Sequence, residues 1–359
     1  MKALVTLPEH TASVQDLPTP QPTSSDEILV RVHYAAQNPT DWKSMRNAPA
    51  GRIVGCDFAG TVEKASPSSS SSSWQPGQRV AGWVHGLSGD PIRGAFAEYL
   101  VTEASLVYGI PDSVSYADAA VVPLAFATAV QALFSRLRLP EPLPGSQLAK
   151  QKGDNPIYFL VSGGTTSVGG YAIQLAKLSG ATVIATGSPR NHAYLKSLGA
   201  DFTVDYKDAH WPEQVRELTH DSLGLALDCI SENGTVEAVV DALSTSKGGH
   251  AVTLLAVKEL REKIKAEKPK VKLESTIAYT VFGRPIDYGD FDNWGGPTPS
   301  DKAFWEKYLA ILPELLSSGT IKPNRVREFG TIEDILTGFK EQEAGRVNAE
   351  KLVYKIITQ

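Results

Sequence analysis

The first 125 residues alternate short apolar segments with turn residues, the pattern of a β-rich domain. Branched and aromatic residues at partly alternating positions predict a strand over 27–35. Gly, Pro and Asp set off three further strand-like segments, at 51–66, 78–84 and 94–102. Six consecutive serines, Ser68 to Ser73, interrupt this pattern, but strand patterns continue on both sides. The serine run therefore predicts a loop tip between strands and not a linker between domains.

From about residue 156 the pattern changes, and short apolar runs alternate with amphipathic segments. The apolar runs predict strands at 156–162, 181–187, 202–206, 224–230 and 250–256, and the amphipathic segments predict helices at 168–180, 191–199, 211–219 and 235–244. Strands that alternate with helices of this length are typical of a parallel sheet with right-handed crossovers. The middle of the chain is therefore expected to be a doubly wound α/β domain.

The last hundred residues are less regular. A segment rich in lysine and glutamate, 258–274, precedes a loop of Gly, Pro and aromatic residues over 282–299. A helix is predicted over 301–319. The chain closes on a short strand pattern, 350–358, that has no neighbouring strands in the sequence. We expect this last strand to return to the sheet of the first domain.

Composition and charge narrow the class of protein. At 359 residues the chain is long enough for two domains, and its 42% apolar and 21% charged residues are typical of a globular protein. A net charge of −5 argues against a nucleic-acid or anionic-membrane surface. Two cysteines make neither a disulfide framework nor a C-x-x-C metal site. The low cysteine count favours a reducing compartment, and no run of about 18 apolar residues occurs, so we expect a cytoplasmic protein without membrane contact.

The predicted strand at 156–162 leads into a glycine-rich turn, 163–169, which reads GGTTSVG and not G-x-G-x-x-G. Backbone N–H groups at the start of the following helix, with the helix dipole, form a binding site for a pyrophosphate. Gly163 would allow the tight turn, Gly169 close packing, and Thr165 or Thr166 a side-chain bond to a phosphate oxygen. The alternative is a structural turn in a domain that binds another ligand, but the surrounding βα units favour a dinucleotide.

The residues after the next strand indicate which nicotinamide cofactor is preferred. An NAD site has Asp or Glu at this point for the ribose 2′-hydroxyl. This chain has Ser188 and Arg190 instead, and a hydroxyl and a guanidinium suit a 2′-phosphate. Tyr206, after the third strand, would add one more hydroxyl. The alternative is that Arg190 only starts a helix, where a cation is mildly disfavoured. The pattern therefore favours NADPH.

Several motifs carry a resemblance to a known family. They are "AAQNPTDWK" (35–43), "GCDFAGTV" (55–62), "PGQRVAG" (76–82), "GAFAEYLV" (94–101), "DAAVVPLAFATA" (118–129), the glycine turn and "GSPRN" (187–191). With them, nearly the whole chain resembles the medium-chain dehydrogenase/reductase superfamily in its zinc-free quinone-reductase-like branch. The resemblance implies an α/β protein with a GroES-like β-domain, residues 1–125 with 284–359, and a Rossmann doubly wound parallel-sheet domain, residues 126–283.

A second group of motifs is more specific: "NPTDWKSMR", "SPRNHAYLKSLGAD", "ALDCIS", "TVFG" and "EAGRVNAEKLV". They are similar to fungal trans-acting enoyl reductases, which work beside highly reducing polyketide synthases whose own reductase domain is inactive. The resemblance implies a reaction between NADPH and an enoyl thioester bound to such a synthase, or to a polyketide–peptide hybrid synthase. Two alternatives remain open: a free-standing quinone or alkenal reductase, and a non-catalytic NADPH-binding sensor.

The resemblance also implies binding residues. The implied NADPH contacts are Thr40, Asp41, Trp42, Lys43, Thr165, Thr166, Ser167, Val168, Gly169, Ser188, Pro189, Arg190, Asn191, Tyr206, Leu254, Leu255, Val347 and Asn348. The implied acyl pocket comprises Thr128, Ala129, Val130, Gln131, Ala132, Leu133, Phe134, Ser135, Tyr279, Thr280, Val281, Phe282 and Gly283. Trp294 is a further candidate for the pocket wall, whereas Trp305 on its helix is expected to be a core residue.

No metal is expected. Zinc-dependent relatives place a Cys where this chain has Asn38, and a His–Glu pair where it has Cys56 and Asp57. Cys56 and Asp57 do not make a tetrahedral site, which needs three or four ligands. Lys43 is then the one candidate for catalysis: it either contacts the cofactor or substrate or gives a proton to the enolate, and water is the alternative donor. The alternative is that Lys43 is only an exposed lysine at a strand end. Asp228 is expected to be a structural carboxylate.

The assembly is expected to be monomeric. Related dimers pair the edge strands of two Rossmann sheets, and here the charged segment 258–274 falls at that edge. Lysine-rich sequence and a proline at a sheet edge oppose pairing between chains, and a buried seam would leave charges without partners. The alternative is that this segment is a solvated loop and that a dimer forms through another face.

Overall fold

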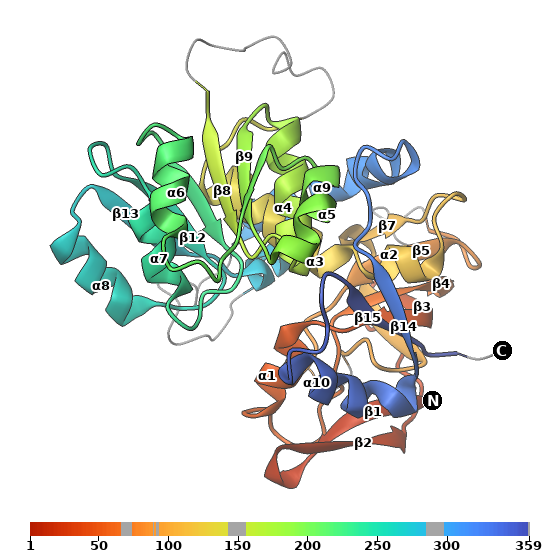
Figure 1. The fold of residues 1–359 in the computed structure, drawn as a ribbon. Coiled ribbons are helices and arrows are strands. Elements are labelled where there is room, and N and C mark those ends of the chain that lie inside the picture. The colour runs from red at the N-terminus through yellow and green to blue at the C-terminus, as the bar shows by residue number, and fades with distance from the viewer. Residues whose placement is uncertain (66–73, 89, 91–92, 143–155, 285–297, 358–359) are drawn as a thin grey trace. The chain divides into compact units, whose positions relative to one another are not determined.

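The structure is a computed structural model that describes all residues except 66–73, 89, 91–92, 143–155, 285–297 and 358–359 (Figure 1). The predicted serine loop, most of the predicted loop over 282–299 and Trp294 lie outside the described residues. The chain forms two compact units. Residues 1–124 and 306–359 form the first, and residues 125–305 form the second.

The first unit contains a seven-stranded sheet and a separate hairpin. The sheet has the order β14-β15-β3-β4-β5-β7, with β6 also paired to β3, and β1 pairs with β2. All pairs in this sheet are antiparallel except β14–β15, which is parallel. The bounds are β1 Lys2–Leu7, β2 Thr11–Asp16, β3 Glu27–Ala36, β4 Asp57–Ala65, β5 Arg79–Trp83, β6 Tyr99–Glu103, β7 Val107–Gly109, β14 Val326–Thr331 and β15 Lys351–Lys355.

The predicted return of the last strand is confirmed, because β15 pairs with β3 through Val353–Ala36, Tyr354–Ala35 and Lys355–Tyr34. Two predicted strands are too long. Of 51–66 only β4 is a strand, and Ile53 makes a single bridge to Val5. Of 94–102 only the end enters β6. Gly55 explains the interruption: its φ is +98°, and a Cβ there would lie 2.7 Å from the Phe96 nitrogen.

The helices of the first unit are short. They are α1 Pro39–Met45, α2 Tyr116–Ala120 and α10 Ile335–Glu343, with one-turn 3₁₀ segments at Pro8–His10, Ala104–Leu106 and Ile332–Asp334. Two further helices cross the unit boundaries, α3 Pro123–Val130 and α9 Pro299–Ser317. The core of the unit contains Phe58 and Phe96 from the N-terminal part, and Phe339 and Tyr354 from the C-terminal part. Residues from both chain ends thus share one hydrophobic core.

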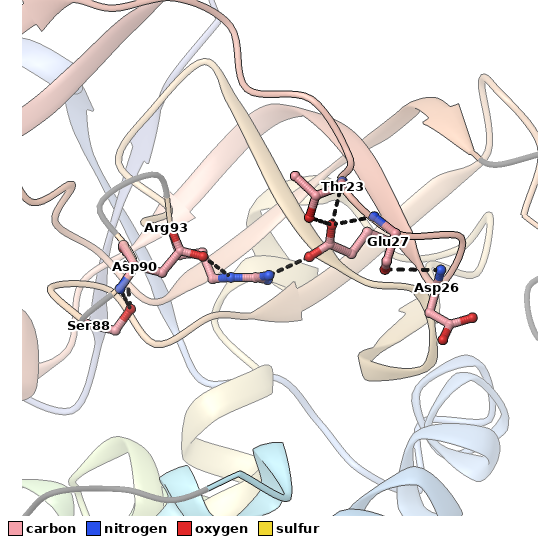
Figure 2. A network of polar contacts seen from close by, with 7 residues as sticks. Thr23, Asp26, Glu27, Ser88, Asp90 and Arg93 are labelled. Atoms are coloured by element: carbon pink, nitrogen blue, oxygen red, sulfur yellow. Dashed lines mark hydrogen bonds and ion pairs between the residues drawn. The ribbon is translucent and has the colours of Figure 1, made fainter.

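A buried ion pair holds the segment between β5 and β6 against the start of β3 (Figure 2). The Arg93 guanidinium donates to Glu27, and its Nε donates to Asp90 at 2.8 Å. The second Glu27 oxygen accepts the Thr23 N–H at 2.8 Å and the Thr23 hydroxyl at 3.0 Å. Burial by itself would raise the pKa of Glu27, but hydrogen bonds from Thr23 and Arg93 lower it below its usual value.

The second unit is the doubly wound domain that the sequence predicts. Six parallel strands have the order β10-β9-β8-β11-β12-β13, and Figure 1 shows them between α4 and α5 on one side and α6 and α7 on the other. The bounds are β8 Tyr158–Ser162, α4 Ser167–Leu178, β9 Thr182–Thr186, α5 His192–Ser197, β10 Phe202–Val204, α6 Trp211–Leu218, β11 Leu225–Asp228, α7 Thr235–Ala242, β12 Gly249–Thr253, α8 Lys258–Glu267 and β13 Val271–Ser275. Shorter segments are the π-helical turn η3 Gln131–Arg136 and the 3₁₀ turns η5 Pro189–Asn191 and η6 Ala278–Phe282.

The charged segment 258–274 is not a loop, as it includes helix α8 and strand β13. Ile264 and Leu273 are both 5% exposed and pack in the core of the unit. The pairing of β13 with β12 continues the parallel sheet from Gly249–Val271 to Thr253–Ser275. The two buried residues are too widely spaced among lysines and glutamates to produce a recognisable apolar period.

The unit boundaries differ from the proposed domains mainly at the C-terminal side. The resemblance implies a return to the first domain at residue 284, whereas the compact units divide between Trp305 and Glu306. Polar contacts tie the start of α9 to the second unit. Thr298 donates to the Thr280 carbonyl at 2.6 Å, and Thr280 donates to Asp301 at 2.6 Å.

Candidate cofactor and substrate site

The glycine turn joins β8 to α4 in a form that requires its glycines. Gly163 has a φ of +77°, and its N–H donates to the Thr186 hydroxyl at 2.8 Å. At Gly169 a Cβ would lie 2.3 Å from the Gly163 carbonyl oxygen and 2.9 Å from the Gly164 Cα. Only glycine lets the first turn of α4 approach the loop this closely. A bare backbone at a helix N-terminus is the arrangement that accepts a pyrophosphate.

The Thr166 side chain has a structural role in the turn. It is the N-cap of α4: its hydroxyl accepts the Gly169 N–H at 3.0 Å and donates to the Gly163 carbonyl at 2.9 Å. This hydroxyl therefore closes the turn and stabilises the start of the helix. Of the two threonines considered for a direct phosphate bond, Thr165 remains the better candidate.

Three of the proposed 2′-phosphate residues lie after neighbouring parallel strands. Ser188 follows β9 and Tyr206 follows β10, and the two hydroxyls are 3.5 Å apart. Tyr206 is 51% exposed, unusually high for a tyrosine, and Arg190 in η5 is also exposed. Asn191, by contrast, is 7% exposed, so its side chain belongs to the interior. The carboxyl edge of this sheet thus presents a hydroxyl pair and an exposed cation.

The carboxyl ends of β11 and β12 are held by local hydrogen bonds. Asp228 is fully buried; its carboxylate accepts the Ile230 N–H at 3.0 Å and the Thr235 hydroxyl at 2.6 Å, as expected for a structural carboxylate. Burial raises its pKa. Leu254 donates its N–H to the Ser231 hydroxyl at 2.9 Å, and the Leu255 carbonyl accepts the Thr253 hydroxyl at 2.9 Å. These bonds fix the backbone at two proposed cofactor contacts.

In the first unit, helix α1 carries the other group of proposed contacts. Thr40 and Lys43 are partly exposed, and the Lys43 ammonium lies 5.6 Å from the centre of the Trp42 ring. The Trp42 indole donates to Gln342 on α10 at 3.1 Å, which holds α1 against α10. Of the proposed C-terminal contacts, Asn348 is exposed, whereas Val347 packs against the core.

Asp41 is placed differently from its neighbours on α1. It is 1% exposed, and its carboxylate accepts the Asn38 N–H at 2.7 Å in a capping box. Burial raises its pKa to about 7, although hydrogen bonds from Asn38 and Cys56 act in the opposite direction. Its side chain thus stabilises the start of α1.

A closed polar network joins Lys351 to Asn38 and Asp57, two of the positions at which the resemblance implies ligands in zinc-dependent relatives. The Lys351 ammonium donates to Asp57 at 2.6 Å and to the Asn38 carbonyl oxygen at 2.9 Å, and the Asn38 amide donates to Asp57 at 2.9 Å. The other Asp57 oxygen accepts the Leu124 N–H in α3 at 2.7 Å. Lys351 is 2% exposed and Asp57 is 0% exposed. Sequence reasoning missed Lys351, because it reads as an ordinary lysine at the start of the last strand.

Cys56 beside this network is a buried thiol, 1% exposed, and burial together with the nearby Asp41 carboxylate raises its pKa well above the usual value. A protonated thiol is a poor metal ligand. Among the described residues, no three His, Cys, Asp or Glu side chains are grouped so as to hold a metal ion.

The proposed acyl-pocket residues are mostly buried. Ala129, Ala132 and Leu133 on the continuous α3–η3 helix are 0% exposed, and Val281 and Phe282 in η6 are 1% and 6% exposed. The two segments are joined by a hydrogen bond of 2.6 Å from the Gln131 amide to the Thr280 hydroxyl. The side chains of Gln131 and Thr280 therefore hold the two segments together.

The aromatic residue Trp305 is a core residue, as expected. It is 1% exposed, and its ring centre lies 6.3 Å from that of Phe126, which in turn lies 5.6 Å from Tyr171.

The fold and the site define a dinucleotide-binding oxidoreductase of two domains, and comparison with known proteins agrees. Residues 24–112 match the alcohol dehydrogenase GroES-like domain, and residues 167–292 match the family described as zinc-binding dehydrogenase. A solved alcohol dehydrogenase superfamily protein from Novosphingobium aromaticivorans has the same fold, with a TM-score of 0.79 at 23% identity over 99% of this chain and 100% of that chain.

Curated relatives are more similar in sequence. The trans-enoyl reductase mpsG of Macrophomina phaseolina is 36% identical and matches 96% of this chain and 93% of its own length. A zinc-type alcohol dehydrogenase-like protein of Schizosaccharomyces pombe is 34% identical over 99% of this chain and 100% of its own length. The chain belongs to the medium-chain dehydrogenase/reductase family. It is an oxidoreductase, and its family and Rossmann domain imply a nicotinamide cofactor, NAD or NADP.

No helix in the described part of the chain is long and apolar enough to cross a membrane.

Proposed function

We propose that this protein is an NADPH-dependent trans-acting enoyl reductase. It reduces the α,β double bond of an enoyl thioester that is bound to a polyketide synthase or to a polyketide–peptide hybrid synthase. The observation that carries the proposal is the similarity along nearly the full chain to relatives named trans-enoyl reductases. The Lys351–Asp57–Asn38 network supports a reaction without zinc, because the Lys351 ammonium already bonds the Asp57 carboxylate and the Asn38 carbonyl oxygen.

The cofactor, when bound, supplies the hydride that adds to the β-carbon of the enoyl thioester. The residues of this chain bind and orient the reactants. The turn at Gly163–Gly169 receives the pyrophosphate, and Ser188, Arg190 and Tyr206 receive the 2′-phosphate. Lys43 either contacts the cofactor or delivers a proton to the α-carbon, and water is the alternative donor.

The preference for NADPH is tested by Arg190→Ala. Loss of one charge-assisted contact costs about 1.5–3 kcal/mol, so the Kd for NADPH is expected to rise by about 10- to 100-fold. The Kd for NADH should stay nearly unchanged, because NADH has no 2′-phosphate. Fluorescence titration with both cofactors gives the two values. The exposed Lys207, which follows Tyr206, provides a control variant, Lys207→Ala. Equal weakening of both cofactors would remove the basis for the NADPH assignment.

The reaction is tested with substrates that separate the three candidate functions. We expect oxidation of NADPH with a crotonyl or longer enoyl group on pantetheine or on a carrier protein, at a kcat/KM far above that for a free quinone. In the same assay, Lys43→Ala separates the two roles of that residue. A rise in the Kd for NADPH indicates a cofactor contact, and slower turnover at an unchanged Kd indicates a proton donor. A preference for quinones or free alkenals would favour a free-standing reductase, and no turnover with any acceptor would favour a sensor.

We also propose that the protein is a cytoplasmic monomer in lasting association with a separate synthase. The edge strand β13 carries Lys272, 63% exposed at its side chain, and Glu274, which are paired with each other. Such charges oppose the addition of a second chain to the sheet edge. A stable dimer by light scattering at micromolar concentration would contradict the monomer.

A further inference from the structure

The start of helix α9 contributes a buried carboxylate that the mechanism above does not use. Asp301 is 8% exposed, and a single oxygen, Oδ2, accepts three hydrogen bonds. The donors are the Thr280 hydroxyl at 2.6 Å, the Arg136 guanidinium at 2.7 Å and the Gln131 amide at 3.2 Å. All four residues belong to the second compact unit. Asp301 therefore connects the π-helical turn η3, the 3₁₀ turn η6 and α9.

The hydrogen bonds around Gln131 fix its side chain in one orientation. The Gln131 amide nitrogen donates to Thr280 and to Asp301, while its carbonyl oxygen accepts the Thr276 hydroxyl at 2.5 Å. A flipped amide would place its oxygen against the Asp301 carboxylate, so only one orientation satisfies the network. Thr298, at the approach to α9, donates to the Thr280 carbonyl at 2.6 Å and closes the network from the other side.

Fold stability alone does not account for such a network. Taking a carboxylate and a guanidinium out of water is costly, and apolar residues of similar volume often stabilise a core as well or better. What a buried hydrogen-bond network provides is a single geometry for the elements it joins. Here those elements are the two segments to which the acyl pocket is assigned, 128–135 and 279–283. Gln131 also begins a π-helical turn, a feature frequently found at functional sites.

We propose that Asp301 is a positioning residue for the substrate. Through Gln131 and Thr280 it sets the spacing of the two segments that form the acyl pocket, and thereby the length of acyl chain that the enzyme accepts. This inference rests on the proposed enoyl reductase function. Asp301 does not touch the reacting atoms; it acts through the residues that it holds.

Thr280 offers a matched pair of variants. Thr280→Val keeps the volume and removes the hydroxyl that bonds Asp301 and Gln131, and Thr280→Ser restores that hydroxyl. With a medium-chain enoyl pantetheine, Thr280→Val is expected to raise KM by about tenfold. The effect on the crotonyl thioester should be smaller, so the ratio of the two KM values changes. The Kd for NADPH should stay within about twofold, and Thr280→Ser should behave like the unmodified enzyme.

Asp301→Asn provides an independent variant if Thr280→Val does not fold. It is nearly isosteric and removes the charge that faces Arg136, so it should shift the same KM ratio in the same direction. If the unmodified enzyme reduces enoyl thioesters but neither variant changes the ratio of the KM values, the positioning role is wrong and the proposed function stands. If the unmodified enzyme reduces no enoyl thioester, both the proposed function and this inference fail.

Discussion

Replacing Lys351 with methionine is expected to lower the free energy of unfolding by about 3–5 kcal/mol, because it leaves the fully buried Asp57 carboxylate without its cation. The Asn38 side-chain carbonyl oxygen would also lose its hydrogen bond from the Lys351 ammonium, which lowers the stability further. In differential scanning calorimetry, the transition that includes the first unit should fall by about 10 °C. This is a large change for one residue that lies in neither of the proposed ligand-binding regions.

Two further variants separate the ion pair from a general effect of losing a lysine. Lys355→Met changes an exposed lysine at the other end of the same strand, β15, and should leave the transition within about 1 °C. The double variant Lys351→Met/Asp57→Asn removes both charges and should recover more than half of the lost stability, because no buried carboxylate remains unpaired. Equal loss in the single and double variants would show that the network is not held by charge.

The metal-free interpretation is tested on the unmodified protein. If the ammonium of Lys351 fills the place of a metal ion, the unmodified protein should keep full activity in EDTA. Elemental analysis should find no stoichiometric zinc. Stoichiometric zinc in the unmodified protein would contradict this reading directly.

Gly169→Ala is expected to weaken NADPH binding by about a hundredfold, near 3 kcal/mol. The added Cβ would lie 2.3 Å from the Gly163 carbonyl oxygen and 3.0 Å from the Thr166 hydroxyl, so the turn has to shift away from α4. Backbone N–H groups at the helix start then no longer converge on the pyrophosphate. In contrast with Arg190→Ala, this variant should weaken NADH and NADPH equally, because both cofactors have a pyrophosphate.

A matched control lies in the same unit. Gly224, just before β11, has no heavy atom within 4 Å of the position that a Cβ would take, so Gly224→Ala should bind both cofactors normally. Circular dichroism of both variants shows whether the domain is intact. Unchanged cofactor affinity in a folded Gly169→Ala variant would mean that the glycine turn does not hold the dinucleotide.

The local sequence determined much of this protein. Short apolar runs that alternate with amphipathic segments predicted five of the six parallel strands, because burial on both faces of a sheet demands such runs. The glycine turn and the absence of an acid near Ser188 could be recognised in the sequence, because each feature consists of residues that are neighbours in the chain. Strand β13 and helix α8 were not predicted, because most of their side chains are charged and exposed. Too few apolar residues lie on their buried sides to give a recognisable period.

The polar networks were decided only by the tertiary structure. Lys351 lies 313 positions from Asn38 and 294 from Asp57, and Asp301 lies 170 positions from Gln131. No local pattern distinguishes these residues from solvated lysines, aspartates and glutamines, since their roles depend on partners brought together by the sheet of one unit and the helices of the other. Burial gives each such contact its strength, because a charge without its partner in the interior is costly, and burial is a property of the folded chain.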